Sequence, residues 1–149
     1  MTPPFATDFT GPEESPGFLL WQVSNLWQRK QRAALKALDL THVQFVLLAN
    51  TAWHTHQGQQ LTQAQLAHHA QIDVMMTSQV LRTLEEKGLV HREAHPRDTR
   101  ANLLSVTPAG LETATRAVAL AEGVDRAFFG QLHEHTGQLT ALLKQLLEE

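Results

Sequence analysis

One stretch of this sequence decides the fold. Residues 73–110 read DVMMTSQVLRTLEEKGLVHREAHPRDTRANLLSVTPAG. Asp73 is a suitable N-cap, because its carboxylate can accept a hydrogen bond from a free backbone N–H of the first helical turn. Gly88 can adopt the left-handed conformation that commonly follows a helix. The stretch therefore opens with a predicted helix that starts after Asp73 and reaches Lys87.

A β-hairpin is predicted directly after this helix. Residues 89–94 and residues 100–106 are short enough to be strands, and the segment between them contains a proline and an aspartate, which are typical of turns. Thr107 then offers a further N-cap, with Pro108 at the first helical position. We expect a long helix from there to about Phe129.

Two similar signals precede the stretch. A threonine three residues before a glutamine is typical of a capping box, in which each side chain bonds to the other residue's backbone N–H. Thr41 with Gln44 and Thr62 with Gln65 have this spacing. The first pair predicts a helix that ends at a glycine, and the second pair predicts a short helix through Ala70.

Long amphipathic segments flank this region. Residues 18–38 carry apolar side chains at helical spacing, without an interrupting glycine or proline. Residues 1–17 contain four prolines and two glycines, which predicts an irregular N-terminal tail. The fold class is therefore expected to be mainly α with a small β wing. A final apolar stripe is formed by Leu139, Leu142, Leu143, Leu146 and Leu147.

Composition excludes several classes of protein. The chain of 149 residues has no cysteine, which removes disulfides, thiol nucleophiles and Cys-ligated zinc. Its hydrophobic content of 42% suffices for a core. No apolar run approaches the roughly 18 residues of a membrane span, and the N-terminus lacks the pattern of a signal peptide. The net charge of −3 disfavours a protein that coats nucleic acid without sequence preference. We expect a cytoplasmic protein without a membrane partner.

The stretch resembles the winged helix-turn-helix of MarR-type transcriptional regulators. Three motifs in register carry the resemblance: LEEKGLV at 84–90, DxR at 98–100 and LxVTxxG at 104–110. The resemblance implies one MarR-type domain over residues 18–149. Within it, a winged helix-turn-helix is implied at about 41–107, and dimerisation helices at about 18–38 and 108–148.

The resemblance also implies a function. Regulators of this type bind double-stranded DNA as homodimers at inverted-repeat operators, and repression is their usual effect. Many respond to a small amphipathic or aromatic ligand, which releases them from the operator. No cofactor is implied.

The predicted helix 74–87 carries a polar surface opposite its apolar face. Such a surface fits the major groove of DNA, although the same pattern taken alone also fits an ordinary amphipathic surface helix. The candidate contacts are Met75 with a thymine methyl group, Ser78 by close approach to a base or the backbone, Gln79 with adenine, and Arg82 with guanine or phosphate.

The predicted hairpin supplies positive charge through Arg92, Arg97 and Arg100. Arginine suits a narrow minor groove, where the negative potential is enhanced. The resemblance favours Asp98 and Arg100 as a structural pair of the wing, with Arg97 nearer the tip. Asp98 taken alone would also fit an ordinary turn residue.

Two other segments could meet the DNA backbone. Thr62 and Gln63 begin the short helix, and free N–H groups at a helix start can bind a phosphate. The densest positive run, residues 29–32 with Lys36, could touch flanking DNA. We interpret that run as a solvated helix face.

The C-terminal leucine stripe needs a partner surface. The first helix, through Trp21 and Trp27, could cover part of it, and a second chain would cover it better. The effector cleft of the family lies between the dimer helices and the DNA-binding part. Trp21, Trp53 and His54 could line such a space, although each also fits ordinary core or rim.

Two other functions stay open. The nine histidines include close pairs at 54/56, 68/69 and 133/135, but none has the i,i+3 or i,i+4 spacing that places two ligands on one helix face. We assign no metal ligands, and a zinc-responsive regulator stays an alternative. The other alternative is a winged-helix protein-interaction module without DNA binding. We predict no enzyme and assign no catalytic residue, because the sequence lacks a phosphate-binding glycine loop, HExxH and GxSxG.

Overall fold

The computed structural model describes residues 2–148. It is mainly α-helical with one two-stranded antiparallel sheet, so the expected fold class is confirmed. The boundaries 1–17 and 18–149 include Met1 and Glu149, which lie outside the described residues. In chain order the elements are α1 (Pro16–Leu35), α2 (His42–His56), α3 (Gln63–Ala70), α4 (Val74–Glu86), β1 (Val90–Ala94), β2 (Asn102–Val106), α5 (Pro108–Phe129) and α6 (Thr136–Leu147), with 3₁₀ helices at Pro12–Glu14, Lys36–Leu38 and Gly130–His135.

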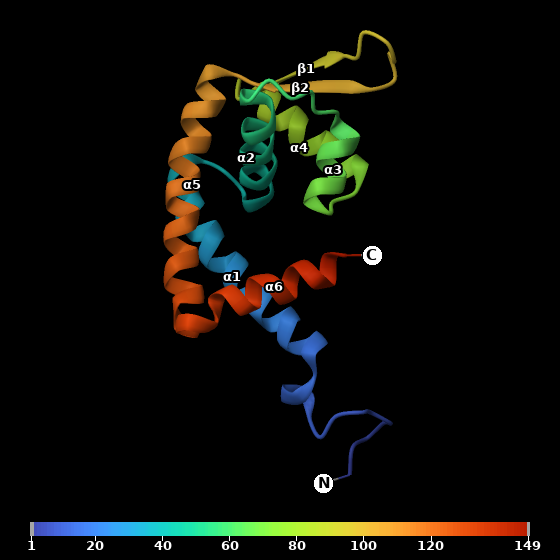
Figure 1. Cartoon of the computed structure of the whole chain (residues 1–149), viewed down its shortest axis with the longest axis vertical. Helices are drawn as coiled ribbons and strands as arrows, with labels where there is room; N and C mark the ends of the chain where they lie inside the picture. The colour runs from blue at the N-terminus through green and yellow to red at the C-terminus, as the bar shows by residue number, and fades with distance from the viewer. Residues whose placement is uncertain (1, 149) are drawn as a thin grey trace.

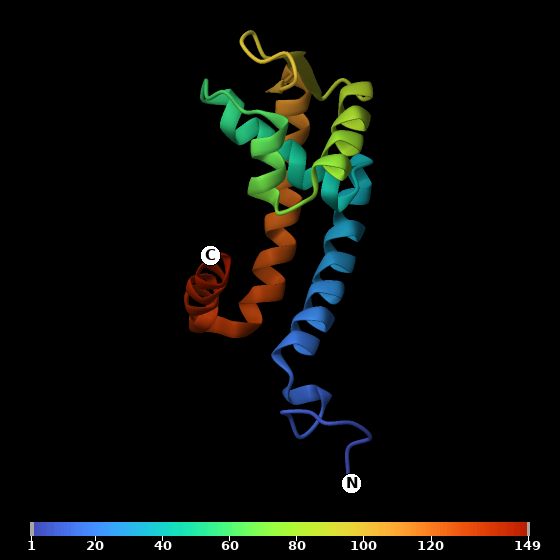
Figure 2. The ribbon, with the colours of Figure 1, turned by 90° about the vertical axis from the view of Figure 1, so that its right-hand side faces the viewer.

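The elements form a lobe and a stem. The lobe consists of α2, α3, α4 and the wing, β1 with β2, which gather at one end of the molecule (Figure 1). The stem consists of α1, α5 and α6. Helix α5 runs from the wing to the turn before α6, and α1 packs against it. In Figure 2, α1 and α6 lie on opposite sides of α5.

Side-chain caps start the helices of the lobe. The side chains of Thr41, Thr62, Asp73 and Thr107 each accept the backbone N–H three residues later, at 3.2, 3.1, 2.8 and 2.9 Å respectively. Both predicted capping boxes are complete. These caps satisfy N–H groups that have no partner within the helix. The predicted starts of α2, α3, α4 and α5 are therefore confirmed.

The boundaries of α1 differ from the predictions. The helix begins at Pro16 rather than at Phe18, because the hydroxyl of Ser15 accepts the N–H of Phe18 at 3.2 Å and caps it. Proline is favourable at the first helical position. The α-helix ends at Leu35, and a 3₁₀ turn follows before Asp39, which has a left-handed backbone with φ 53°.

The wing is shorter than predicted. β1 and β2 pair in antiparallel register and lack one and two residues, respectively, of the ranges expected from the sequence. The N–H of Ala101 bonds to the carbonyl of Asp98 at 3.0 Å, which keeps the residues before 102 in the turn. The N–H of Leu104 donates to the carbonyl of Leu61 at 2.9 Å. This bond fastens the wing to the segment that precedes α3.

The core lies between α2, α4, the wing and the wing-proximal part of α5. It is built mainly from leucine, and truncating such a side chain to alanine typically costs about 2–5 kcal/mol. The largest apolar side chains that are completely buried in this core are Leu35, Leu47, Leu48, Leu66, Leu81, Leu84 and Val90.

The chain turns between α5 and α6 at His133, which has a positive φ of 51°. Gly130 begins the 3₁₀ segment of this turn, whereas Gly137 lies inside α6. Within the described range 2–148, no helix is long and apolar enough to cross a membrane.

The apolar faces of α1 and α6 are uncovered in the single chain. Helix α6 buries none of its side chains. Trp27 does not reach it, because the indole N–H donates to Asp125 at 2.8 Å and the ring meets His42 edge to face at 5.0 Å. Within one chain, α1 therefore leaves most of the leucine stripe exposed. The exposed apolar residues are Phe18, Leu19, Leu20, Trp21, Val23 and Leu26 of α1, and Leu142, Leu143, Leu146 and Leu147 of α6.

Candidate nucleic-acid interface

Helix α4 has one side that is buried in the core of the lobe and an opposite side that is exposed to solvent. Leu81 and Leu84 are fully buried in the core of the lobe. On the other side of the helix, Met75 is 75% exposed, and Gln79 and Arg82 are exposed as well. These side chains are free to contact a ligand, while the buried leucines fix the orientation of the helix. This is the arrangement required for a helix that enters the major groove.

A half-buried arginine joins three elements of the lobe. Arg92, on β1, pairs with Glu85 of α4 at 3.3 Å, and its side chain is only 15% exposed. The same guanidinium donates to the side-chain oxygen of Gln63 at 3.1 Å and to the hydroxyl of Ser78 at 3.4 Å. Glu85 also accepts the backbone N–H of Arg92 at 3.2 Å. We call this group the Arg92 junction; it ties together α3, α4 and the wing.

The junction changes the interpretation of two residues. Arg92 was counted among the positive charges of the hairpin, but its charge is compensated by Glu85 inside the lobe. Ser78 was expected to approach DNA, yet it is half-buried and its hydroxyl accepts from Arg92. Sequence reasoning missed the junction, because no local spacing rule links a helix to the strand that follows it. The available signal was a glutamate before Gly88 and an arginine after it, Glu85 and Arg92.

Replacing Arg92 with methionine is expected to lower the free energy of unfolding by about 1–3 kcal/mol, because the change leaves Glu85, Gln63 and Ser78 without their shared donor. Denaturant unfolding followed by circular dichroism measures the effect. Arg97→Met is the matched control and should change stability by no more than about 0.5 kcal/mol, since Arg97 is exposed. Equal stability of the two variants would show that the junction has no structural role.

The tip of the wing exposes two arginines. Asp98 accepts the backbone N–H of Arg100 at 3.1 Å and its side-chain Nε–H at 3.4 Å, while the Arg100 side chain stays 92% exposed. The N–H groups of Arg97 and Asp98 both donate to Nδ1 of His95, at 3.0 and 3.3 Å. The turn is thus held by Asp98 and His95, and both guanidinium groups face solvent. An ion pair this exposed contributes little to stability, so its effect is to orient the turn.

The start of α3 lies next to the wing. Thr62 forms an isolated β-bridge with Leu103, and its hydroxyl is occupied by the cap of α3. Gln63 is half-buried, and its side-chain oxygen accepts from Arg92. The two positions predicted to meet a phosphate are therefore held in a fixed relation to α4 and the wing.

The three suggested effector-binding residues do not line one space within the chain. Trp53 is 69% exposed at a cavity of about 330 Å³ between α2 and α5. His54 lies outside that cavity, bonded to Gln59 at 3.1 Å and stacked on His69 at 5.0 Å. Trp21 is exposed on α1 and is not among the residues that line the cavity, which are Ala49, Ala52, Trp53, His56, Gln57, Leu111, Ala114, Thr115 and Val118.

The histidines do not assemble a metal centre in the part of the chain that the structure describes. Among residues 2–148, no group of three or more His, Cys, Asp or Glu side chains is placed to hold a metal ion. His54 and His69 approach one another by ring stacking. His133 and His135 lie at the α5–α6 turn, and the latter is 3.6 Å from Glu134.

Comparison with known proteins agrees with this geometry. A sequence model of the MarR family matches residues 40–101. The HTH-type transcriptional regulator YdcH of Bacillus subtilis is 45% identical over 95% of this chain and 96% of its own length. The HTH-type transcriptional repressor Rv2887 of Mycobacterium tuberculosis is 32% identical over 89% of this chain and 91% of its own length. The DNA complex of MepR from S. aureus superimposes with a TM-score of 0.79 at 26% identity, covering 89% of this chain and 96% of MepR.

Proposed function

Because the chain belongs to the MarR family of transcriptional regulators, we propose that it represses transcription by binding an inverted-repeat operator as a homodimer. The observation that carries the proposal is the α4 surface, which is polar, exposed and anchored by Leu81 and Leu84. The name of Rv2887 supports repression, and the MepR complex supports duplex DNA as the ligand. The two alternatives, zinc sensing and a protein-interaction module, have no comparable support.

Contacts to bases are assigned to α4. Gln79 suits a bidentate contact with adenine, Arg82 suits guanine, and Met75 suits a thymine methyl group. Arg97 and Arg100 project from the wing, where a narrow minor groove would attract them. The start of α3 would position a phosphate through its backbone N–H groups, with Thr62 and Gln63 defining the place. Ser78 acts indirectly, through the Arg92 junction.

The homodimer is assigned to the uncovered faces of α1 and α6. Ten large apolar side chains are exposed on these two helices, and contiguous exposed apolar surface on a soluble protein typically marks an interface. Replacing both Leu142 and Leu146 with glutamate is expected to yield a folded monomer. Those side chains are 51% and 75% exposed, so the chain's own core does not need them. Light scattering measures the mass. The matched control is Gln138→Glu with Gln145→Glu, which should remain dimeric, and a dimeric leucine double variant would place the interface elsewhere.

A small-molecule effector is assigned to the cavity between α2 and α5. Its volume of about 330 Å³ lies in the range of ligand pockets, and most of its lining side chains are apolar. Trp53 and His56 stand at the cavity and could select an aromatic ligand. Occupation of this cavity would act on α2, which packs against α4 and the wing.

We also infer that the protein is not an enzyme and works in the cytoplasm. Both inferences follow from the proposed role at an operator, since transcriptional regulators bind DNA where it is transcribed. The relatives named above are regulators or repressors.

The direct test is a gel-shift assay with the duplex upstream of the protein's own gene. We expect a retarded complex that survives an excess of scrambled duplex, and steep weakening by salt through counterion release. Adding benzoate or a related aromatic acid should release the duplex. It should also quench the tryptophan fluorescence of a variant in which Trp21 and Trp27 are replaced with phenylalanine, so that Trp53 is the only tryptophan. A complex that is lost equally to scrambled competitor would overturn the proposed function, whereas insensitivity to aromatic acids would overturn only the effector assignment.

A further inference from the structure

The first turn of α4 carries an exposed apolar patch. Val74, Met75 and Met76 follow the cap residue Asp73, and their side chains are 55%, 75% and 47% exposed. Among residues 2–148, none of the three belongs to the buried core. Methionine is one of the residue types most often fully buried in proteins, so two adjacent exposed methionines are unusual. The patch is therefore available to a ligand rather than to the chain's own core.

Met75 and Met76 also carry all the sulfur of the part of the chain that the structure describes. The sequence has no cysteine, and its third methionine is Met1. Thiols and thioethers are the side chains that proteins oxidise reversibly, and exposure favours the reaction. Within residues 2–148, reversible oxidation at sulfur is therefore confined to one turn of the helix that we assign to DNA.

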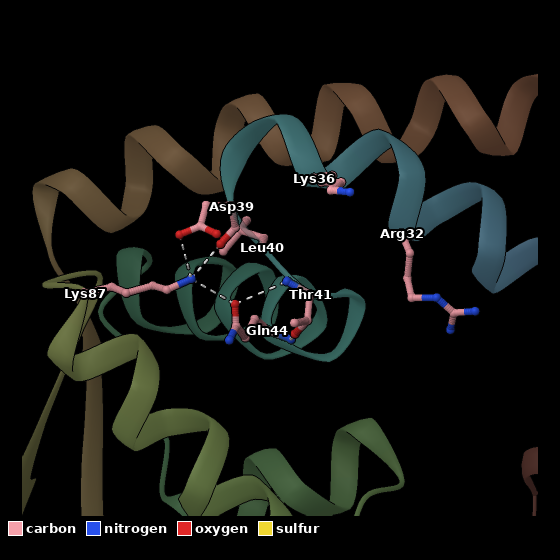
Figure 3. Close-up of a pocket in the computed structure, with 7 residues that line it drawn as sticks. All are labelled: Arg32, Lys36, Asp39, Leu40, Thr41, Gln44 and Lys87. Atoms are coloured by element: carbon pink, nitrogen blue, oxygen red, sulfur yellow. Dashed lines mark hydrogen bonds and ion pairs between the residues drawn. The ribbon is translucent and has the colours of Figure 1, made fainter.

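Helix α4 is held at both ends by contacts that do not involve sulfur. At its start, the Asp73 carboxylate accepts the backbone N–H of Met76 at 2.8 Å, and the hydroxyl of the buried Thr77 donates to the carbonyl of Asp73 at 2.9 Å. At its end, the ammonium of Lys87 donates to the backbone carbonyl of Asp39, whose carboxylate lies 3.6 Å away (Figure 3). A chemical change at the exposed sulfur atoms therefore alters the surface of α4 without releasing the helix from the lobe.

We propose that Met75 and Met76 form an oxidation site, at which a hydroperoxide weakens operator binding. The inference rests on the proposed function, because it concerns the same surface of α4. The modification is the conversion of each thioether to a sulfoxide, which sulfoxide reductases reverse. The oxidation site thus provides a reversible chemical signal in a chain that has no cysteine.

The reaction is a transfer of one oxygen atom. The thioether sulfur attacks the outer oxygen of the hydroperoxide, and the O–O bond breaks as the S–O bond forms. The proton of the transferred oxygen passes to the leaving oxygen, which departs as water or as an alcohol. The sulfur is oxidised by two electrons, and the peroxide is reduced by the same two electrons.

The sulfoxide changes what α4 offers to a base pair. A thioether suits contact with the apolar methyl group of thymine, whereas the sulfoxide group is polar. In the major groove its oxygen would lose water, and a thymine methyl group has no hydrogen-bond donor to replace it. Because burying an unpaired polar group is unfavourable, we expect the affinity for the operator to fall by about tenfold.

The first experiment measures oxidation without DNA. The full-length protein and free methionine are treated with hydrogen peroxide in one tube, and fragment-ion mass spectrometry follows the added oxygen at each residue. Because their side chains are exposed, Met75 and Met76 should react at rates within about tenfold of that of free methionine. The circular dichroism spectrum should stay unchanged. Slower oxidation, or a loss of helical signal, would overturn the proposal.

The second experiment measures operator affinity before and after treatment by fluorescence anisotropy. The affinity should fall by about tenfold and should recover after incubation with methionine sulfoxide reductases A and B, which each reduce one sulfoxide epimer. Oxidised tryptophan is not a substrate of these enzymes, so recovery assigns the effect to sulfur. A fall of less than about threefold with both sulfur atoms oxidised, or a loss that the reductases do not reverse, would contradict the switch.

A matched variant removes the sulfur atoms and keeps the surface apolar. Met75→Leu with Met76→Leu has side chains of similar volume, and its own untreated affinity is the reference for its treated sample. Peroxide should change that affinity by less than about twofold, since no sulfur remains on α4. A leucine variant that loses affinity as steeply as the parent chain would show that the oxidation acts elsewhere, and the proposal would fail.

A DNA arm separates this inference from the proposed function. Bound operator should slow the oxidation of Met75 by about threefold or more, because contact with DNA lowers its exposure, whereas scrambled duplex should not. Selective operator binding without protection of Met75 would overturn the inference alone. If the untreated protein binds no operator, the proposed function fails, while rapid and reversible oxidation of an intact fold would still support the oxidation site itself.

Discussion

Replacing Gln79 and Arg82 together with alanine should weaken sequence-selective duplex binding by about 2–6 kcal/mol, which is at least about a thirtyfold rise in Kd. Both side chains are exposed on α4 and make no contact that the lobe needs. Each would lose a contact with a base edge that is worth about 1–3 kcal/mol. Fluorescence anisotropy with a labelled operator duplex measures the change, and circular dichroism verifies the fold.

The matched control uses the same residue types outside the lobe. Arg116→Ala with Gln138→Ala removes one exposed arginine and one exposed glutamine from the stem. It should alter operator affinity by less than about threefold. If the α4 variant had a normal circular dichroism spectrum and bound the operator as selectively as the parent chain, Gln79 and Arg82 of α4 would not be the residues that recognise the bases.

Replacing Gly110 with alanine should destabilise the protein by about 2–4 kcal/mol, because the position has no space for a side chain. A Cβ atom there would lie 1.9 Å from the carbonyl oxygen of Leu89 and 2.9 Å from a methyl carbon of Val106. The Leu89 carbonyl cannot turn away freely, since it accepts the backbone N–H of Thr107 at 3.1 Å. The start of α5 must therefore move away from the wing.

Denaturant unfolding at equal protein concentration measures this effect. Gly137→Ala provides the control, because nothing lies within 4 Å of a Cβ atom at that position inside α6. It should raise stability by up to about 1 kcal/mol through helix propensity. A Gly110→Ala variant as stable as the parent chain would refute the close packing of the wing against α5.

The sequence predicted well the helix starts that are set by hydrogen bonds between residues close together in the chain. Each of the caps at Thr41, Thr62, Asp73 and Thr107 needs only a side chain and the backbone three residues later, so its signal is complete within one turn. Where the local signal was misinterpreted, the boundary was wrong. Pro16 was assigned to an irregular tail, although Ser15 followed by proline is also a good helix start.

Contacts between distant segments could not be predicted in the same way. The Arg92 junction brings together side chains from α3, α4 and β1, and only the assembled lobe places them within bonding distance. Two of the suggested effector-binding residues, Trp53 and His54, do not line the same cavity within the chain, because they are neighbours on one helix. Neighbours on a helix point about 100° apart, so Trp53 reaches the cavity while His54 turns toward His69.

The most direct test of DNA recognition by α4 is protection of guanine N7 from dimethyl sulfate on the bound operator. That atom lies in the major groove. Two helices of a homodimer should protect two clusters of guanines whose centres are about 10 base pairs, or a multiple of that spacing, apart. The Gln79 and Arg82 double alanine variant should lose both clusters. A selective complex that leaves every guanine N7 reactive would contradict insertion of α4 into the major groove.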